Sequence, residues 1–155
     1  MDTSTPNAIE FSEVRDALLN NEKPFSTGLL YFFSDINRED LKRITAVWPK
    51  VRVQRRRALL EDMESLAEAD TLLFFDHFAT YCLEDKDPVA RATAIRLLWQ
   101  SQDEELVPLL LKRMVEDPES IVRAAAATGL GLFVYLGEVE EIKTATYEDC
   151  PHHRN

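Results

Sequence analysis

The chain has 155 residues, 45% of them apolar, which suits one domain with a substantial core. Its formal net charge of −10 argues against general binding to nucleic acids or anionic membranes, because both would repel the chain. Only four glycines are present, so glycine-rich phosphate-binding loops have almost nothing to be built from.

The expected compartment follows from features that the sequence lacks. The first 20 residues carry four acids and no apolar run of the length of a signal peptide. No stretch approaches the roughly 18 apolar residues of a membrane helix. The two cysteines, Cys82 and Cys150, do not indicate a disulfide scaffold. We therefore expect a soluble, cytoplasmic protein with no membrane partner.

The predicted elements are helical along the whole chain. An N-terminal cap is expected first, with an amphipathic helix that carries Phe11, Val14 and Leu18 and a short apolar helix at residues 29–33. Strand alternation is missing, so the predicted fold class is all-α and one domain. The predicted parts are the cap at 1–33, a degenerate hairpin at 34–68, hairpins at 71–100 and 103–136, and a partial helix with a polar tail at 137–155.

Local signals place the helices of these hairpins. Apolar side chains between residues 53 and 68 recur on one helical stripe, and on the opposite face Arg57 and Glu61 stand four residues apart, where they are expected to pair. Asp87 followed by Pro88 marks a helix start, because aspartate caps the first turn and proline fits into it. In the last two hairpins we expect first helices at 71–83 and 103–115 and second helices at 88–100 and 120–135.

The last two hairpins repeat each other at a distance of 32 residues. In each copy an aspartate of the turn stands six residues before an arginine of the second helix, as Asp85 and Arg91 and then as Asp117 and Arg123. We expect these four residues to form a structural ladder within or between hairpins, because arginine can donate two hydrogen bonds to one carboxylate. Helical hairpins in series predict a solenoid.

The pattern D-x-x-x-x-V-R-x-x-A, found at residues 117–126 and more loosely at 85–94, resembles the HEAT repeat of armadillo-like helical proteins. The resemblance covers residues 71–136 well and 34–68 weakly, and the whole chain looks like uncharacterised bacterial HEAT-repeat proteins. It implies an α-α superhelix of about three stacked hairpins that serves as an interaction surface. In the first copy Pro49 stands in place of the turn aspartate, so Arg55 lacks the usual ladder partner.

The C-terminal part holds only part of a capping repeat, although solenoids need terminal repeats with a polar outer face. The segment from Val134 to Ile142 begins with apolar residues and then runs into a polar tail. We expect an exposed apolar flank that pairs with another molecule, a second copy included, or a repeat array that is shortened here.

Few residues suit catalysis or metal binding. His77 and Cys82 are five residues apart and do not share a helix face, so they do not form a nucleophile pair, and Cys82 reads as a small buried side chain. The tail run from Glu148 to His153, with Cys150 and His152, could offer three metal ligands, whereas a structural zinc site takes four in two separated pairs. We expect no catalytic residue, no metal and no cofactor.

The basic segment from residue 41 to 60 is the strongest local feature. It contains seven basic residues and no acid, namely Lys42, Arg43, Lys50, Arg52, Arg55, Arg56 and Arg57. Such an asymmetry is typical of a docking patch for an acidic partner or a phosphate. The alternative is a solvated face, in which Arg57 pairs with Glu61 and Arg56 lays its stem on the core. Trp48 and Trp99 are expected to pack in the core or between repeats, with a binding role as the alternative.

The predicted function is a non-catalytic protein–protein interaction scaffold that presents a curved helical surface to an acidic partner protein. Two rivals remain open. One is an enzyme like the HEAT-repeat bilin lyases, which would use Cys82 or Tyr81 in an open pocket. The other is nucleic-acid or phosphate binding through residues 42–57. The predicted partner-binding residues are Arg52, Arg55, Arg56, Arg57 and Arg96.

Overall fold

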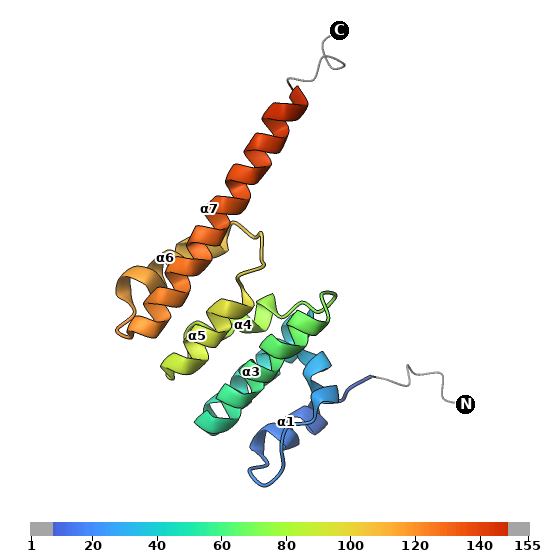
Figure 1. Ribbon diagram of the computed structural model, residues 1–155. Helices are drawn as coiled ribbons and strands as arrows, with labels where there is room; N and C mark the ends of the chain where they lie inside the picture. Colours follow the sequence, from blue (N-terminus) through green and yellow to red (C-terminus); the bar gives the residue numbers. More distant parts are fainter. Residues whose placement is uncertain (1–7, 149–155) are drawn as a thin grey trace, which may run out of the picture. The chain divides into compact units, whose positions relative to one another are not determined.

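A computed structural model describes the backbone of residues 8–148 and the side chains of residues 8–138 (Figure 1). Every regular element in this part of the chain is a helix, which confirms the all-α class. Helical hairpins follow one another along the chain, as in an α solenoid. The chain divides into two compact units, unit 1 up to Leu98 and unit 2 from Trp99 onward.

Unit 1 holds the expected N-terminal helices and two helical hairpins. Its helices are α1 (Phe11–Leu19), the 3₁₀ helix η1 (Thr27–Phe33), α2 (Arg38–Val47), the 3₁₀ helix η2 (Trp48–Lys50), α3 (Val53–Ala69), α4 (Asp76–Cys82) and α5 (Pro88–Leu97). Helix α3 packs against α5, and α4 packs against α5 as the other half of its hairpin. The second helix of the first hairpin thus lies beside that of the next (Figure 1).

Aromatic and aliphatic side chains form the core of unit 1. Phe78 of α4 lies between two other rings, with its centroid 4.7 Å from that of Phe33 and 5.1 Å from that of Trp48. The stripe predicted on α3 is confirmed for Leu59 and Leu60, which are fully buried. Trp48, one of the two tryptophans, is therefore a core residue with only 3% of its surface exposed.

Local signals fix some helix starts in unit 1 and tertiary contacts override others. The Asp87 carboxylate accepts a hydrogen bond from the Ala90 amide at 2.9 Å, which confirms the predicted cap of α5. The predicted start of the preceding helix at residue 71 is wrong, because α4 begins at Asp76. The preceding segment bonds elsewhere: the Phe74 carbonyl accepts from the Asp35 amide at 2.6 Å, and the Phe74 amide donates to Ser34 at 3.0 Å.

Unit 2 consists of α6 (Leu106–Glu116) packed against α7 (Ser120–Glu148). The second helix of this hairpin is longer than predicted: α7 continues through Gly137 without a break, in a region without proline. The Trp99 indole donates to the Ala125 carbonyl at 3.1 Å and lies against Gly129, where a Cβ atom would be 3.0 Å from the Trp99 ring. Glycine therefore allows the indole to approach the helix backbone closely.

One stretch of α7, Ser120–Glu138, is long and apolar enough to cross a membrane by length and composition, so the expectation that no stretch approaches a membrane helix is wrong by these two criteria. Only 22% of it is buried. Core helices of soluble proteins can have the same length and composition.

Candidate functional site

The arginines of the predicted ladder bind the turns that precede their helices. The Arg91 guanidinium donates to the backbone carbonyls of Asp85 at 2.8 Å and Lys86 at 3.1 Å. Arg123 donates in the same way to the Asp117 carbonyl at 2.8 Å. In both copies the arginine thus closes its own hairpin through the main chain, which is a structural role.

The Asp85 carboxylate is the centre of a buried polar network in unit 1. It accepts hydrogen bonds from the Trp48 indole at 2.7 Å, from Arg56 Nε at 3.1 Å and from the Asp87 amide at 2.9 Å. The Arg56 side chain is 13% exposed, and its Nη1 also donates to the Val51 carbonyl at 2.6 Å. Arg56 is therefore a partly buried structural cation whose Nε, Nη1 and Nη2 atoms all donate within the chain.

Arg57 and Arg96 also bind carboxylates of the same unit. Arg57 reaches Asp87, with Nε 2.8 Å from Oδ2, so the pair expected with Glu61 is replaced by a bond to another helix. These hydrogen bonds raise the pKa of Arg57 and lower the pKa of Asp87. Arg96 of α5 pairs with Glu64 of α3 at 2.7 Å, and this bond raises the pKa of Arg96. Both arginines join α3 to α5.

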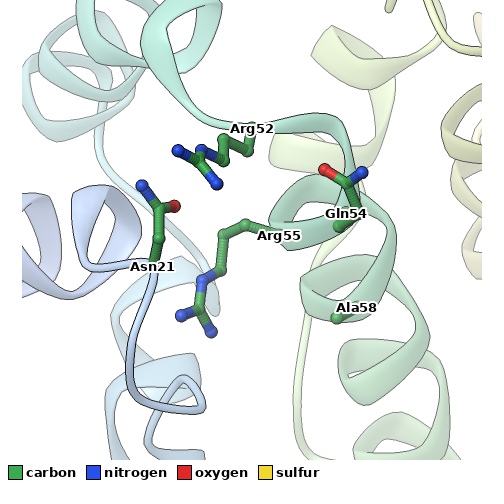
Figure 2. A pocket seen from close by; sticks show the side chains of 5 residues that line it. All are labelled: Asn21, Arg52, Gln54, Arg55 and Ala58. Atoms are coloured by element: carbon green, nitrogen blue, oxygen red, sulfur yellow. The ribbon is translucent and has the colours of Figure 1, made fainter.

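The remaining two arginines of the predicted set lie at the start of α3. The Arg52 side chain is exposed and makes no hydrogen bond or ion pair with any residue in the described part of the chain. Its side chain and that of Arg55 extend toward the loop that carries Asn21 (Figure 2). The three border an open pocket of about 290 Å³, lined by Asn21, Arg52, Gln54, Arg55 and Ala58. No acidic residue is among these lining residues.

Arg55 is held in place by the loop opposite. Its Nη2 donates to the carbonyls of Asn20, at 2.6 Å, and of Lys23. The sequence predicted that Arg55 lacks the turn aspartate of the repeat. Arg55 instead bonds to carbonyls of the loop after α1, whereas Arg91 bonds to carbonyls of its own turn. The Nε atom of Arg55 is buried and has no hydrogen-bond partner in the structure. Arg55 is thus a fixed cation with an unused donor.

The sequence did not single out Asn21 or Gln54 as part of this site. Asn21 precedes Arg52 by about 30 residues, and no motif connects them. Only the packing of unit 1 brings the loop after α1 to the first turn of α3 (Figure 2).

Cys82 and Tyr81 do not form an open reactive pocket. The Cys82 side chain is fully buried, and desolvation raises its pKa well above the ordinary value. Burial also raises the pKa of Tyr81. A reactive cysteine needs an accessible, stabilised thiolate, and both shifts favour the neutral forms. His77 is exposed and its Nε2 lies 3.7 Å from Asp35 Oδ1, whereas Cys82 is buried, so His77 is not placed to act as a general base for Cys82.

Among the residues that the structure describes, no group of three or more histidine, cysteine, aspartate or glutamate side chains could hold a metal ion. Of the candidate metal ligands in the tail, Cys150, His152 and His153 lie outside the described residues, and so does the side chain of Glu148.

Unit 2 exposes several large apolar side chains. Three lie on α6, namely Leu109, Leu111 and Val115; Leu111 is 43% and Val115 is 71% exposed, and their spacing of four residues places these two on one face. On α7, Val134 and Tyr135 are more than half exposed. The apolar flank predicted near the C-terminus thus includes residues at the surface of α7.

Comparison with known proteins supports the repeat assignment. Residues 76–146 match the family model of HEAT repeats. A search of curated proteins and a search of solved structures each returned no match. The fold and the match together define an all-helical repeat protein of the α-solenoid class. Within that class, residues 76–146 are similar to HEAT repeats. HEAT repeats commonly act as scaffolds for protein–protein interaction.

Proposed function

We propose that this chain is a non-catalytic, cytoplasmic protein–protein interaction module that binds an acidic segment of a partner protein at the start of α3. The observation that carries the proposal is the pocket beside Arg52 and Arg55, where no lining residue is acidic. In a chain with a net charge of −10, a pocket with two arginines and no acidic lining residue favours an acidic ligand.

The internal ion pairs narrow the predicted contact set. Arg56, Arg57 and Arg96 each bind a carboxylate of unit 1, so a partner would have to break those bonds to use them. Arg52 and Arg55 remain as the contacts. Arginine forks suit carboxylates and other oxyanions, which supports an acidic rather than an apolar ligand at this place.

The burial of Cys82, the candidate nucleophile, supports the proposal of a non-catalytic role. The Cys82 thiol is buried and its pKa is raised, so the bilin-lyase-like alternative would need a different residue. Nucleic-acid binding through residues 42–57 has less support, because Arg56 and Arg57 of that segment are engaged within the chain.

The test is affinity capture with charge-reversal variants. Wild type is compared with Arg52→Glu and with Arg43→Glu, a matched control that makes the same charge change on α2, where Arg43 already lies beside Asp40. We expect a specific partner to be held by wild type and Arg43→Glu and lost by Arg52→Glu. Equal retention by all three proteins would contradict the proposal. A variant with all four arginines from Arg52 to Arg57 changed to Glu would not serve this test, because it would also break the bond between Arg56 and Asp85.

A second candidate is self-association through the exposed apolar residues of α7. Val134 and Tyr135 are 61% and 62% exposed on consecutive positions of the helix, and a cluster of exposed apolar side chains is typical of an interaction site. Sedimentation of wild type and of the double variant Val134→Lys, Tyr135→Lys tests it. A concentration-dependent dimer that the variant abolishes is expected, and a wild-type monomer at all concentrations would contradict it.

A further inference from the structure

We propose that the pocket at the start of α3 binds a phosphate monoester group, with Arg52 and Arg55 as its cationic ligands (Figure 2). The inference rests on the proposed function, because both place the ligand in this pocket. It adds which anion the pocket binds.

The donors around the pocket exceed what one carboxylate can accept. Arg52 has all five of its side-chain N–H donors unused within the described residues, and Arg55 uses only Nη2 for its bonds to the loop. Asn21 and Gln54 contribute side-chain amides to the lining. A carboxylate has two oxygens, whereas a phosphate monoester presents three terminal oxygens that are strong acceptors. The number of donors therefore favours phosphate.

The charge at this place also suits a dianion. Two guanidinium groups line the pocket and no lining residue is acidic. The pocket lies beside the first turn of α3, a 17-residue helix with no acid in that turn and no side-chain cap. The positive end of the helix dipole adds to the potential of the two arginines. A phosphate monoester carries about −1.5 to −2 charges at pH 7, which matches two cations better than a single carboxylate does.

Of the two arginines that would bind the phosphate, one is held in place and the other is free to move. Arg55 is fixed through Nη2 by the carbonyls of Asn20 and Lys23, so its position is set before a ligand arrives. Arg52 is exposed and unpaired within the described residues, so it can close over the anion. A pre-positioned donor lowers the entropic cost of binding.

Titration of the ¹⁵N-labelled full chain with three probes tests this inference. The probes are inorganic phosphate and two short glycine-flanked peptides, one with phosphoserine and one with glutamate, all at constant ionic strength. The Nε–H signals of Arg52 and Arg55 are followed, with those of Arg57 and Arg96 as internal references. We expect saturable shifts of the first pair alone, with the glutamate peptide binding more weakly than the phosphoserine peptide.

The Arg52→Ala variant should weaken phosphopeptide binding about tenfold or more, because a hydrogen bond to a charged group contributes enough for such a factor. Arg43→Ala should leave binding unchanged. Affinity should fall between pH 7.5 and 5.5 for the phosphopeptide, because its second pKa is about 6, and should not fall for the glutamate peptide. Stronger binding of the phosphopeptide than of inorganic phosphate identifies a phosphorylated partner side chain as the source, and equal binding identifies a small phosphate.

Two outcomes overturn the inference. One is the absence of saturable shifts at Arg52 and Arg55 with either phosphate probe. The other is a glutamate peptide that binds as tightly as the phosphoserine peptide, which would leave the acidic-partner proposal intact. A third outcome separates the two proposals. If the pocket binds phosphate but Arg52→Glu captures the same proteins as wild type, the proposed function is overturned and the phosphate site stands.

Discussion

Arg57 of α3 and Asp87 at the start of α5 are joined by two hydrogen bonds, from Nε to Oδ2 at 2.8 Å and from Nη2 to Oδ1 at 2.5 Å. The same carboxylate caps α5 by accepting from the Ala90 amide. One side chain therefore starts a helix and fastens it to the equivalent helix of the preceding hairpin. Asp87 thus connects neighbouring hairpins of unit 1 and is also the N-cap residue of α5.

Substitution at Asp87 should separate these two roles. Asp87→Ala removes the cap and the ion pair, whereas Asp87→Asn keeps a good cap and removes the charge. We expect Asp87→Ala to be less stable than Asp87→Asn by about 1 kcal/mol, the usual contribution of a cap. Urea unfolding followed by circular dichroism measures the difference. Equal stability of the two variants would mean that the cap contributes nothing here.

The stability of unit 1 should depend on pH at the acid end. Hydrogen bonds from Arg57 lower the pKa of Asp87 below its ordinary value of 3.8. The native state therefore binds this proton less readily than the unfolded chain does. The resulting stabilisation is present above pH about 4 and is lost as the pH falls through the lowered pKa. Unfolding between pH 5 and 2 should show a smaller acid-induced loss in Asp87→Asn than in wild type; parallel curves would contradict this.

Removal of the Arg56 side chain should destabilise the protein strongly. Arg56→Met leaves the Asp85 carboxylate, whose side chain is 2% exposed, without its cationic partner. Breaking a buried pair in this way costs about 3 kcal/mol or more. Arg52→Met is the matched control, because Arg52 is exposed, and its effect should stay within about 0.5 kcal/mol. Similar stability of both variants in urea would show that Arg56 is not a structural residue.

Two glycines of α7 should respond to alanine in opposite directions. At Gly131 nothing lies within 4 Å of an added Cβ, so Gly131→Ala should stabilise unit 2 by up to about 1 kcal/mol through helix propensity. At Gly129 the Cβ would lie 3.0 Å from the Trp99 ring, which is held by its bond to Ala125. Gly129→Ala should therefore destabilise, by about 1 kcal/mol after the propensity gain is counted. Thermal unfolding of both variants checks the signs.

The Cys82 thiol should be unreactive in the folded protein. Its burial raises its pKa, so little thiolate forms and no reagent reaches it. In a Cys150→Ser background, a disulfide reagent at pH 8 should label no thiol until denaturant is added, and one thiol afterwards. Rapid labelling under native conditions would reopen the enzymatic alternative.

The sequence by itself determined the helical class, the repeat and several helix starts. These depend on periodicity and on hydrogen bonds between near neighbours, as between Asp87 and Ala90. The tertiary structure decided how the arginines are used. Arg57 bonds to Asp87 although Glu61 stands four residues away, because α5 packs beside α3 and presents a carboxylate to its fork.

The candidate site was decided in the same way. Composition marked residues 42–57 as basic, yet Arg56 lies in a buried network and Arg52 stays exposed, although both belong to one run. Asn21 joins Arg52 and Arg55 only because the loop after α1 folds back onto α3. The physical reason is that burial and partner choice depend on side chains distant in sequence, whereas helix formation depends on those within a few residues.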